Sequence, residues 1–228
     1  MMKLSIVMPV LDEAAEIEAA LSALAPYRRR GVEVIVVDGG SSDGTAERAR
    51  MLADRVIAAA RGRSLQMNAG ATAARGDVLL FLHADTQLPE NADRLVLDGL
   101  AVSDRVWGRF DVRIKGGGLL GLISLIMNWR SRLSGIATGD QSLFVTRAAF
   151  DSVGGFPPIA LMEDVVLSAK LKRIGRPCAL RARVTTSARR WRRHGTLRTV
   201  LLMWRLRLRF FLGADPAKLA RVYGYAER

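Results

Sequence analysis

The residues best suited to chemistry lie where a short apolar run ends in polar side chains. Residues 78–82 are all apolar and predict a buried strand, and His83, Ala84 and Asp85 follow it directly. Ligands of open α/β sheets bind at the carboxyl ends of the strands, so Asp85 is well placed to hold a divalent cation against a phosphate. The alternative is that Asp85 only caps the helix that Pro89 opens. The rest of the chain has to decide between these two roles.

Two earlier apolar runs end in a similar way. The predicted strand 4–10 is followed by Asp12 and Glu13, and the predicted strand 34–37 by the loop 38–45, which is rich in Gly, Ser and Asp. The backbone N–H groups of such a loop can approach a ligand, and the helix that follows points its positive end the same way. Polar loops of this kind at one sheet edge are what a nucleotide-diphosphate site requires.

Strands and helices alternate along this half of the chain. Asp12 is the expected N-cap of the first helix, and a third strand, 55–60, leads through Arg61 and Arg63 into another helix. This alternation, which continues to Asp85, predicts an α/β fold with a mostly parallel sheet covered by helices on both faces.

Further along, the pattern changes. Residues 106–114 alternate in the way that a half-exposed strand does, and three glycines at 116–118 precede the apolar segment 119–133. No segment reaches the roughly 18 consecutive apolar residues that a membrane-spanning helix needs. The sequence therefore predicts no transmembrane span.

The second half of the chain contains two further acidic motifs. Asp140 and Gln141 precede an expected strand at 142–146, and Glu163 and Asp164 open an expected helix. Such an acid pair could be no more than a favourable first turn on the helix dipole.

Composition narrows the class of protein. The chain has 228 residues, half of them hydrophobic, which is enough to bury a sizeable core in one domain of ordinary size. Cys178 is the only cysteine, and His83 and His194 are the only histidines, so an internal disulfide and a cysteine or histidine zinc cluster are excluded. This usage fits a reducing cytoplasm.

The net charge of +13 comes from one region. Residues 165–214 contain fourteen Lys and Arg and no Asp or Glu. A basic block of this size indicates an anionic partner, which is a phospholipid surface, a nucleic acid or the phosphates of a substrate.

Residues from His194 onward predict a basic amphipathic helix within this block. One face combines Leu197, Val200, Leu201, Trp204, Leu208 and Phe211, and Arg198, Arg205 and Arg209 form a separate stripe. Tryptophan and apolar bulk beside the charge favour an anionic membrane surface as the partner. The alternative is a helix packed on the core, with its arginines exposed or bound to phosphates. We expect residues 191–228 to be a C-terminal extension of a domain that spans 1–190.

Together these motifs resemble the family 2 glycosyltransferases of the GT-A fold, over roughly residues 3–190. The motifs, in chain order, are Val7-Met8-Pro9-Val10-Leu11-Asp12-Glu13, Val37-Asp38-Gly39-Gly40-Ser41-Ser42-Asp43-Gly44-Thr45, Leu82-His83-Ala84-Asp85, Gly139-Asp140-Gln141 and Met162-Glu163-Asp164. Their order and spacing are more specific than any one of them. Within the family, the chain is most similar to small bacterial transferases sometimes named for arsenosugar biosynthesis.

The resemblance implies a site for a nucleotide-sugar donor. The residues implied in nucleotide binding are Pro9, Glu13, Asp38, Ser41, Asp43, Arg61, Arg63, Asn68 and Ala84. Carboxylates suit the donors of a base and a ribose, and guanidinium groups suit phosphate. The resemblance further implies a UDP-linked donor.

The resemblance also implies a metal cofactor, Mn²⁺ or Mg²⁺. Asp85 matches the last acid of the family's Asp-x-Asp motif, and His83 stands where the first acid is expected. Histidine can ligate Mn²⁺ or hydrogen-bond a sugar or phosphate. The alternative is a buried core histidine.

The remaining motifs are implied in catalysis and substrate contact. Asp164 matches the catalytic base, which takes the proton of the acceptor hydroxyl in an inverting transfer, and Glu163 is implied in acceptor binding. Asp140 and Gln141 are implied in contacts with the donor sugar or the acceptor. Arg189, Arg190 and Trp191 are candidates for contact with the diphosphate. The acceptor is unknown, and the basic helix suggests a lipid-linked or membrane-proximal one, with the protein on the inner face of the cell membrane.

Two other functions compete with this one. A nucleotidyltransferase would share the sheet and the metal, but a Gly-rich loop with Arg and Lys is expected after its first strand, where this chain has residues 9–13. A basic membrane- or nucleic-acid-binding module would explain residues 165–214 but leaves the acids at the element ends without a role. We therefore expect no nucleic acid partner.

Overall fold

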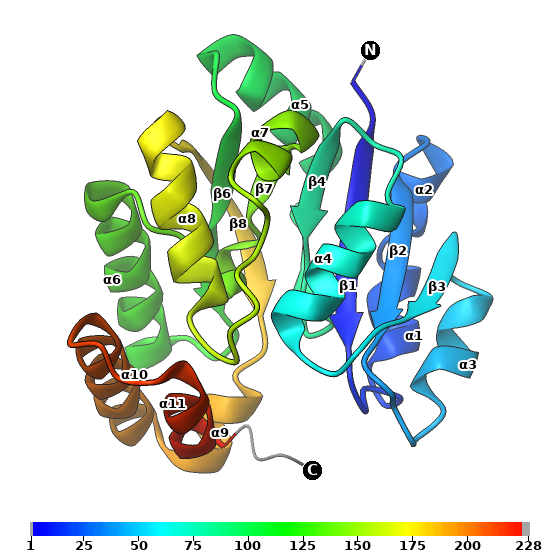
Figure 1. Cartoon of the computed structure of the whole chain (residues 1–228). Helices are drawn as coiled ribbons and strands as arrows, with labels where there is room; N and C mark the ends of the chain where they lie inside the picture. Colours follow the sequence, from blue (N-terminus) through cyan, green and yellow to red (C-terminus); the bar gives the residue numbers. More distant parts are fainter. Residues whose placement is uncertain (1, 225–228) are drawn as a thin grey trace.

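One eight-stranded sheet forms the centre of the computed structural model, which describes residues 2–224 apart from the side chains of Arg190 and His194 (Figure 1). The strands are β1 (Leu4–Val10), β2 (Glu33–Asp38), β3 (Arg55–Ala58), β4 (Val78–Phe81), β5 (Thr86–Gln87), β6 (Trp107–Ile114), β7 (Phe144–Thr146) and β8 (Cys178–Thr186). Their order across the sheet is β3-β2-β1-β4-β7-β6-β8-β5.

The helices are α1 (Ile17–Ser22), α2 (Ala25–Arg29), α3 (Thr45–Arg50), α4 (Arg63–Ala73), α5 (Ala92–Ser103), α6 (Gly118–Ser134), α7 (Arg147–Ser152), α8 (Glu163–Ile174), α9 (Arg189–His194), α10 (Thr196–Phe211) and α11 (Pro216–Tyr223), with a 3₁₀ turn, η1, at Gly139–Gln141. Among the described residues, no helix is both long and apolar enough to cross a membrane.

The sheet is parallel in its first half and mixed in its second. The β1–β2, β2–β3, β1–β4 and β6–β8 pairs are parallel, and the β4–β7, β6–β7 and β5–β8 pairs are antiparallel. The predicted α/β fold with a mostly parallel sheet is therefore confirmed. Strands β1, β2 and β4 end at the same edge because they run in one direction.

Two apolar layers cover the faces of the sheet. Side chains of α1, α2 and α5 pack with Ile6 and Val36 on one face, and side chains of α4, α7 and α8 pack with Val7 and Val37 on the other. Burial on both faces explains why these strands are continuously apolar. Helix α4 lies so close to the sheet that a Cβ atom at Gly70 would come within 2.3 Å of the Val7 side chain.

The prediction that residues 106–114 form a half-exposed strand is wrong, because most of this strand is buried on both faces. Strand β6 covers most of this range, but Arg109 and Asp111 on its expected polar face are buried, with exposed fractions of 1% and 8%. Helix α6 covers them: Arg132 on α6 lies 2.9 Å from the Asp111 carboxylate, and Arg109 pairs with the same carboxylate. The charged residues of the alternating pattern therefore form a buried ion pair and do not face solvent.

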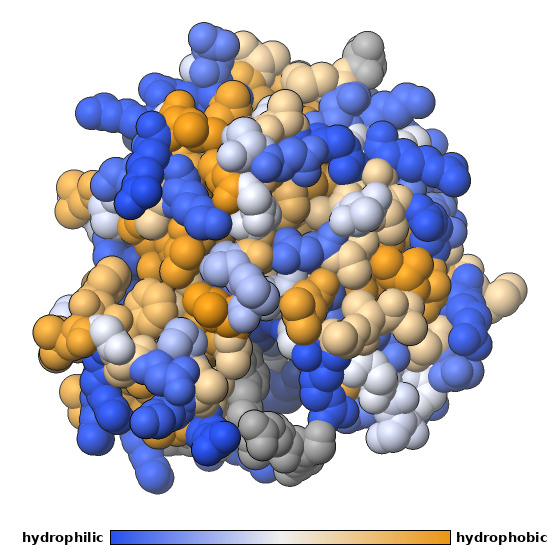
Figure 2. Space-filling view, viewed as in Figure 1, coloured by the Kyte–Doolittle hydropathy of each residue, from blue (hydrophilic) through white to orange (hydrophobic). Residues whose placement is uncertain are grey.

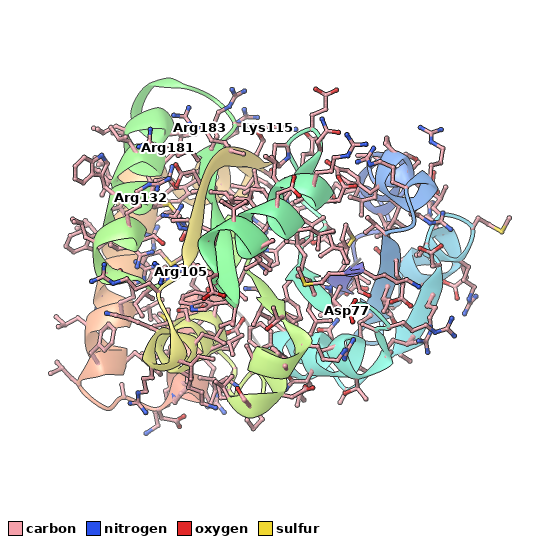
Figure 3. All side chains as sticks on the ribbon, turned by 90° about the horizontal axis from the view of Figure 1, so that it is seen from above. Asp77, Arg105, Lys115, Arg132, Arg181 and Arg183 are labelled. Carbon is pink, nitrogen blue, oxygen red and sulfur yellow. The ribbon has the colours of Figure 1, made fainter. Side chains whose placement is uncertain are left out.

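Two other features differ from the sequence prediction. Asp12 is not an N-cap: α1 begins only at Ile17, and the Asp12 carboxylate instead accepts a hydrogen bond from Ser42 N at 2.9 Å. Strand β8 was not expected, because Arg181 and Arg183 interrupt its apolar pattern. Both arginines are exposed and lie on the same side of the molecule as Lys115 and Arg132, away from Asp77 (Figure 3).

The C-terminal helices pack on the rest of the chain. Leu206 of α10 and Leu219 of α11 form a small apolar cluster with Leu161, Met162 and Val165 at the start of α8. The division at residue 190 stays a prediction, but residues on both sides of it share this cluster.

The buried ion pair on β6 yields a stability prediction. Asp111→Asn removes the carboxylate that both Arg109 and Arg132 use, and we expect the free energy of unfolding to fall by about 3–5 kcal/mol, because a buried guanidinium is left without its counter-ion. Urea denaturation followed by circular dichroism measures this. Asp98→Asn, on the exposed surface of α5, should leave the free energy unchanged, and an equal effect of the two variants would contradict the prediction.

Candidate active site

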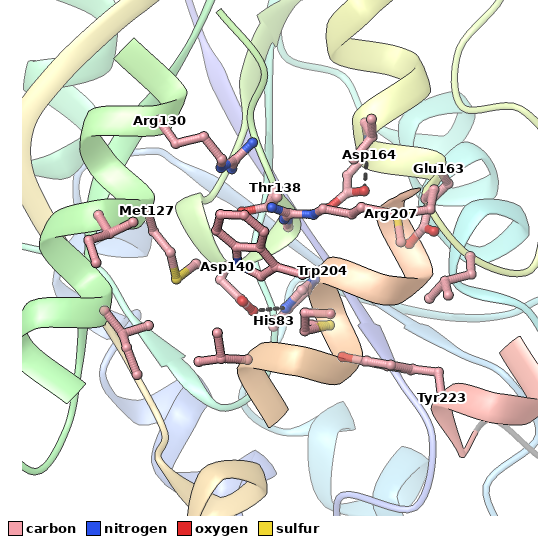
Figure 4. Close-up of a pocket in the computed structure, with 18 of the residues that line it drawn as sticks. His83, Met127, Arg130, Thr138, Asp140, Glu163, Asp164, Trp204, Arg207 and Tyr223 are labelled. Carbon is pink, nitrogen blue, oxygen red and sulfur yellow. Dashed lines mark hydrogen bonds and ion pairs between the residues drawn. The ribbon is translucent and has the colours of Figure 1, made fainter. Parts of the chain in front are cut away.

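A cavity of about 180 Å³ lies where the sheet edge, η1, the start of α8 and the C-terminal helices meet (Figure 4). Its polar lining comes from Arg63, His83, Arg130, Asp140, Glu163, Asp164 and Arg207, and its apolar walls come chiefly from α6 and α10. Five of the titratable residues singled out in the sequence, Arg63, His83, Asp140, Glu163 and Asp164, therefore meet at one place, although the first and the last are 101 positions apart.

Asp164 is anchored between α8 and η1. Its Oδ2 accepts a hydrogen bond from Gly139 N at 2.6 Å, and its Oδ1 accepts one from Val165 N at 2.7 Å. Because the residue lies in the first turn of α8, the positive end of the helix dipole favours its negative charge. The carboxylate is held in the cavity wall by backbone groups, which leaves little freedom in its orientation.

His83 packs against the same turn. A Cβ atom at Gly139 would lie 2.7 Å from the His83 ring, so only glycine allows this approach. Burial, with the nearby positive charge of Arg63, lowers the pKa of His83 to about 3. The imidazole is therefore neutral at physiological pH, and its Nδ1 lies 3.8 Å from Asp140 Oδ1, beyond hydrogen-bond distance.

Two acids of the cavity hold protons more tightly than free carboxyl groups. Burial and the neighbouring carboxylate of Asp85 raise the pKa of Asp140 to about 6. Burial, opposed by Arg63 and reinforced by Asp164, raises the pKa of Glu163 to about 7. Arg63 Nη1 lies 3.6 Å from Glu163 Oε1. The negative charges of these carboxylates repel one another, and a bound cation or proton would reduce that repulsion.

The donor set around Asp85 suits a metal that a substrate helps to hold. In residues 2–224, no group of three or more His, Cys, Asp or Glu side chains is arranged to hold an ion alone. Mg²⁺ and Mn²⁺, however, are often bound by one or two carboxylates together with substrate phosphates. Asp85 and Asp140 are close enough for the first to raise the pKa of the second, which fits such a shared site.

The loops after β1 and β2 are joined by hydrogen bonds that use several predicted nucleotide-binding residues. Asp38 is buried, and its carboxylate accepts hydrogen bonds from Gly40 N at 3.0 Å and from Ser41 N and Oγ at 3.0 and 2.5 Å. Asp43 accepts from Ala14 N at 2.9 Å and from Thr45 Oγ1 at 2.5 Å. These bonds shape the loops, and contact with a nucleoside stays a prediction.

Glu13 and Arg189 connect the C-terminal part to this edge. Arg189 lies 3.2 Å from Glu13 and 2.8 Å from Glu16. Burial raises the pKa of Glu13, and the charge of Arg189 opposes that shift. Arg189 thus contacts acids in this structure, Trp191 lines the cavity, and the side chain of Arg190 lies outside the described residues.

Two predicted site residues make hydrogen bonds within the fold. Gln141 is fully buried, and its carboxamide bonds to Thr138 N at 3.3 Å and to Asn128 Oδ1 at 3.5 Å, so its contact with donor sugar or acceptor stays a prediction. Asn68 makes two hydrogen bonds to the backbone of Phe156 and does not line the cavity.

The other predicted nucleotide-binding residues lie near the sheet edge. Pro9 is half-buried in β1, Ala84 is buried, and Arg61 is exposed just before α4. None of these three lines the cavity.

Sequence reasoning missed Arg130 and Arg207. Each has arginine neighbours in its own helix, Arg132 beside Arg130 and Arg205 and Arg209 beside Arg207, so the sequence carried no signal that marked these two as the ones lining the cavity. Burial and the charge of Arg207 lower the pKa of Arg130 to about 10.

The raised pKa of Glu163 has a consequence for stability. The group binds a proton more tightly in the folded state, so the stability it contributes is complete below its unfolded pKa of 4.5 and is lost as the pH rises to about 7. Glu163→Gln should therefore be more stable than the wild type at pH 8, by on the order of 1–3 kcal/mol, and equal to it near pH 4.5. Urea denaturation across this pH range measures the difference. Glu47→Gln, at an exposed position, should follow the wild type, and a pH-independent effect of Glu163→Gln would contradict the prediction.

Comparison with known proteins agrees with this geometry. The sequence model of glycosyl transferase family 2 matches residues 5–155, more than half of the chain. A PGL/p-HBAD biosynthesis glycosyltransferase of Mycobacterium tuberculosis is 31% identical over 167 residues, which are 67% of this chain and 62% of the relative. The chain thus spans less than two thirds of that relative's length.

Solved structures share the fold. The mannosyltransferase PcManGT of Pyrobaculum calidifontis, in complex with GDP-Man and Mn²⁺, has a TM-score of 0.68 at 20% identity, covering 98% of this chain and 69% of its own. TarS of S. aureus in complex with UDP-GlcNAc has a TM-score of 0.67 at 19% identity, covering 82% and 58%. The assignment to arsenosugar-type transferases stays a prediction. The family match shows that this chain belongs to glycosyl transferase family 2, and the shared architecture shows that it has the GT-A fold.

Proposed function

We propose that this glycosyltransferase moves a sugar from a nucleotide-diphosphate sugar to an acceptor hydroxyl with inversion, and that Asp164 is the general base. The observation that carries the proposal is the anchoring of Asp164 in the cavity wall by Gly139 N at 2.6 Å. A base must be held within reach of one hydroxyl proton, and this carboxylate has the required rigidity.

The proposed reaction requires one group that accepts the proton of the acceptor hydroxyl. The acceptor oxygen bonds to the anomeric carbon while the bond from that carbon to the diphosphate oxygen breaks and its electron pair leaves with the oxygen. The hydroxyl proton passes to Asp164. Attack opposite the leaving group requires donor and acceptor on different sides of the sugar. In Figure 1, α6 and α10 lie on one side of α8 and the ends of β1 and β2 on the other, which supports that separation.

We place the donor at the edge formed by β1, β2 and β4. The strand ends and loops there carry the predicted nucleotide-binding residues Pro9, Glu13, Asp38, Ser41 and Asp43. Arg63, at the start of α4, is the candidate for binding the diphosphate. UDP is our first candidate nucleotide, since TarS binds UDP-GlcNAc, although PcManGT binds GDP-Man.

A divalent ion, Mn²⁺ or Mg²⁺, would be held by Asp85, with His83 and Asp140 beside it and the donor phosphates completing its coordination. When bound, it would neutralise charge that develops on the departing diphosphate. Neutral His83 is in the protonation state that a metal ligand needs.

One crossed experiment tests donor binding and catalysis. We expect calorimetry to show that one of UDP, GDP, CDP and ADP binds in the presence of Mn²⁺, that Asp85→Asn abolishes this binding, and that Asp164→Asn retains it. Slow hydrolysis of the matching donor sugar should fall about 10²- to 10⁴-fold in Asp164→Asn, because a general base is lost. Asp151→Asn, exposed on α7, is the matched control and should behave as wild type. Full hydrolysis in Asp164→Asn would exclude it as the base.

We also propose that α10 attaches the protein to an anionic membrane surface, on the cytoplasmic face. Leu197, Leu201, Trp204, Leu208 and Phe211 are each 61–71% exposed, so the apolar face of α10 is not used by the core. Exposed arginines, Arg198, Arg205 and Arg209, flank it. Such a face with basic edges fits the interface of an anionic bilayer.

Vesicle sedimentation tests this attachment. We expect the protein to sediment with phosphatidylglycerol vesicles and not with phosphatidylcholine vesicles, and the double variant Leu201→Glu, Leu208→Glu to bind at least about tenfold more weakly, because charge replaces buried apolar surface. Met51→Glu, Val102→Glu is a matched control: both residues are more than 85% exposed outside α10, and the charge change is the same. Equal binding of the two double variants would refute the attachment through α10.

A further inference from the structure

The cavity has an unexplained pair of cations. Arg130 Nε and Nη2 are buried and have no hydrogen-bond partner among the described residues. Arg207 lines the same cavity as Arg130, and its positive charge lowers the pKa of Arg130. The two guanidinium groups are therefore close to each other. Figure 4 shows both extending toward the space beside Asp164 and Thr138. Buried guanidinium N–H groups without hydrogen-bond partners are costly even though the Asp164 carboxylate favours the charge of Arg130, and an anionic ligand that accepts from them offsets the cost.

The part of the cavity between α6 and α10 is largely apolar. Ile123, Ile126 and Met127 of α6 face Val200, Met203 and Trp204 of α10 across it. A sugar or a nucleotide presents too little apolar surface to fill such walls, whereas a hydrocarbon or isoprenoid body would.

The cavity opens on an apolar surface. Ile126 and Trp204 line the cavity and are also 51% and 69% exposed, so they form its rim. Beyond the rim, α6 carries an exposed stripe of Leu119, Leu122, Ile126, Trp129 and Leu133, at helical spacing, next to the exposed face of α10. In Figure 2, hydrophobic residues lie among charged ones over the lower left, where α10 and α11 lie. A tail that leaves the cavity would emerge on the surface proposed to meet the membrane.

We propose that this cavity is the acceptor site, and that the acceptor is an amphiphile with a phosphate or similar anionic group bound by Arg130 and Arg207 and an apolar body held between α6 and α10. The inference rests on the proposed glycosyl transfer and names the class of its acceptor. The anionic group fixes the head of the molecule beside Asp164, so that a hydroxyl next to it reaches the base. The tail orients the molecule toward the rim.

Calorimetric titration with octyl phosphate and octyl glucoside, both below micelle-forming concentration, tests the inference. Octyl phosphate should bind more tightly than octyl glucoside. Arg130→Gln and Arg207→Gln should each weaken the binding of octyl phosphate about 10- to 100-fold, because a charge-assisted hydrogen bond is lost. Both variants should leave the affinity for octyl glucoside unchanged. Met203→Gln should weaken both compounds. Arg94→Gln, an exposed arginine of α5 outside both the cavity and the α10 surface, is the matched control and should change the binding of neither compound.

The same samples are titrated with UDP and Mn²⁺ to separate this inference from the proposed function. Unchanged nucleotide binding in the arginine variants is expected. If they lose nucleotide binding and keep octyl phosphate binding, the arginines belong to the donor diphosphate and the inference is wrong. Equal affinity of the wild type for the two octyl compounds also overturns it. Loss of a nucleotide site in the wild type, with octyl phosphate binding intact, would instead count against the proposed donor.

Discussion

The hydrogen bond from Gly139 N to Asp164 connects the η1 turn to the start of α8, and the site depends on this junction. The sheet edge meets the same turn, because the His83 ring occupies the space that a Gly139 side chain would take. Because backbone groups rather than flexible side chains fix the carboxylate, its orientation follows from the packing of the fold.

Electrostatics in the cavity favour bound ligands over the empty site. Asp140 and Glu163 have raised pKa values because burial and neighbouring carboxylates disfavour their charge, while Arg130 has a lowered pKa because burial and Arg207 disfavour its charge. The charges in the cavity are thus only partly compensated, although Arg63 lies 3.6 Å from Glu163. A cation near the acids and an anion near the arginines would each lower the free energy of the site, which is how preorganised sites convert folding energy into binding.

The C-terminal helices contribute to the site as well as to the surface. Leu206 and Leu219 anchor α10 and α11 to the start of α8, and this anchoring brings Arg207 into the cavity while Leu201 and Leu208 stay exposed. One helix therefore presents different faces to the core, the cavity and solvent, as a period of 3.6 residues allows. Proposed membrane contact and proposed acceptor binding would then be linked by one rigid element.

The sequence by itself determined the features that depend on local patterns, which are the strands, the polar loops that follow them and the short acidic motifs. Continuous apolar runs ending in polar loops predicted the α/β sheet. The order of the short motifs singled out Asp140, Glu163 and Asp164, which line one cavity with His83, and their roles there stay predictions. Tertiary structure alone decided contacts between distant segments. It buried Gln141 behind hydrogen bonds, and it covered the polar face of β6 with α6. It also brought Arg130 and Arg207 together from positions 77 residues apart. Spacing along a strand or helix fixes which face a side chain takes, but the element that covers this face depends on packing across the whole chain.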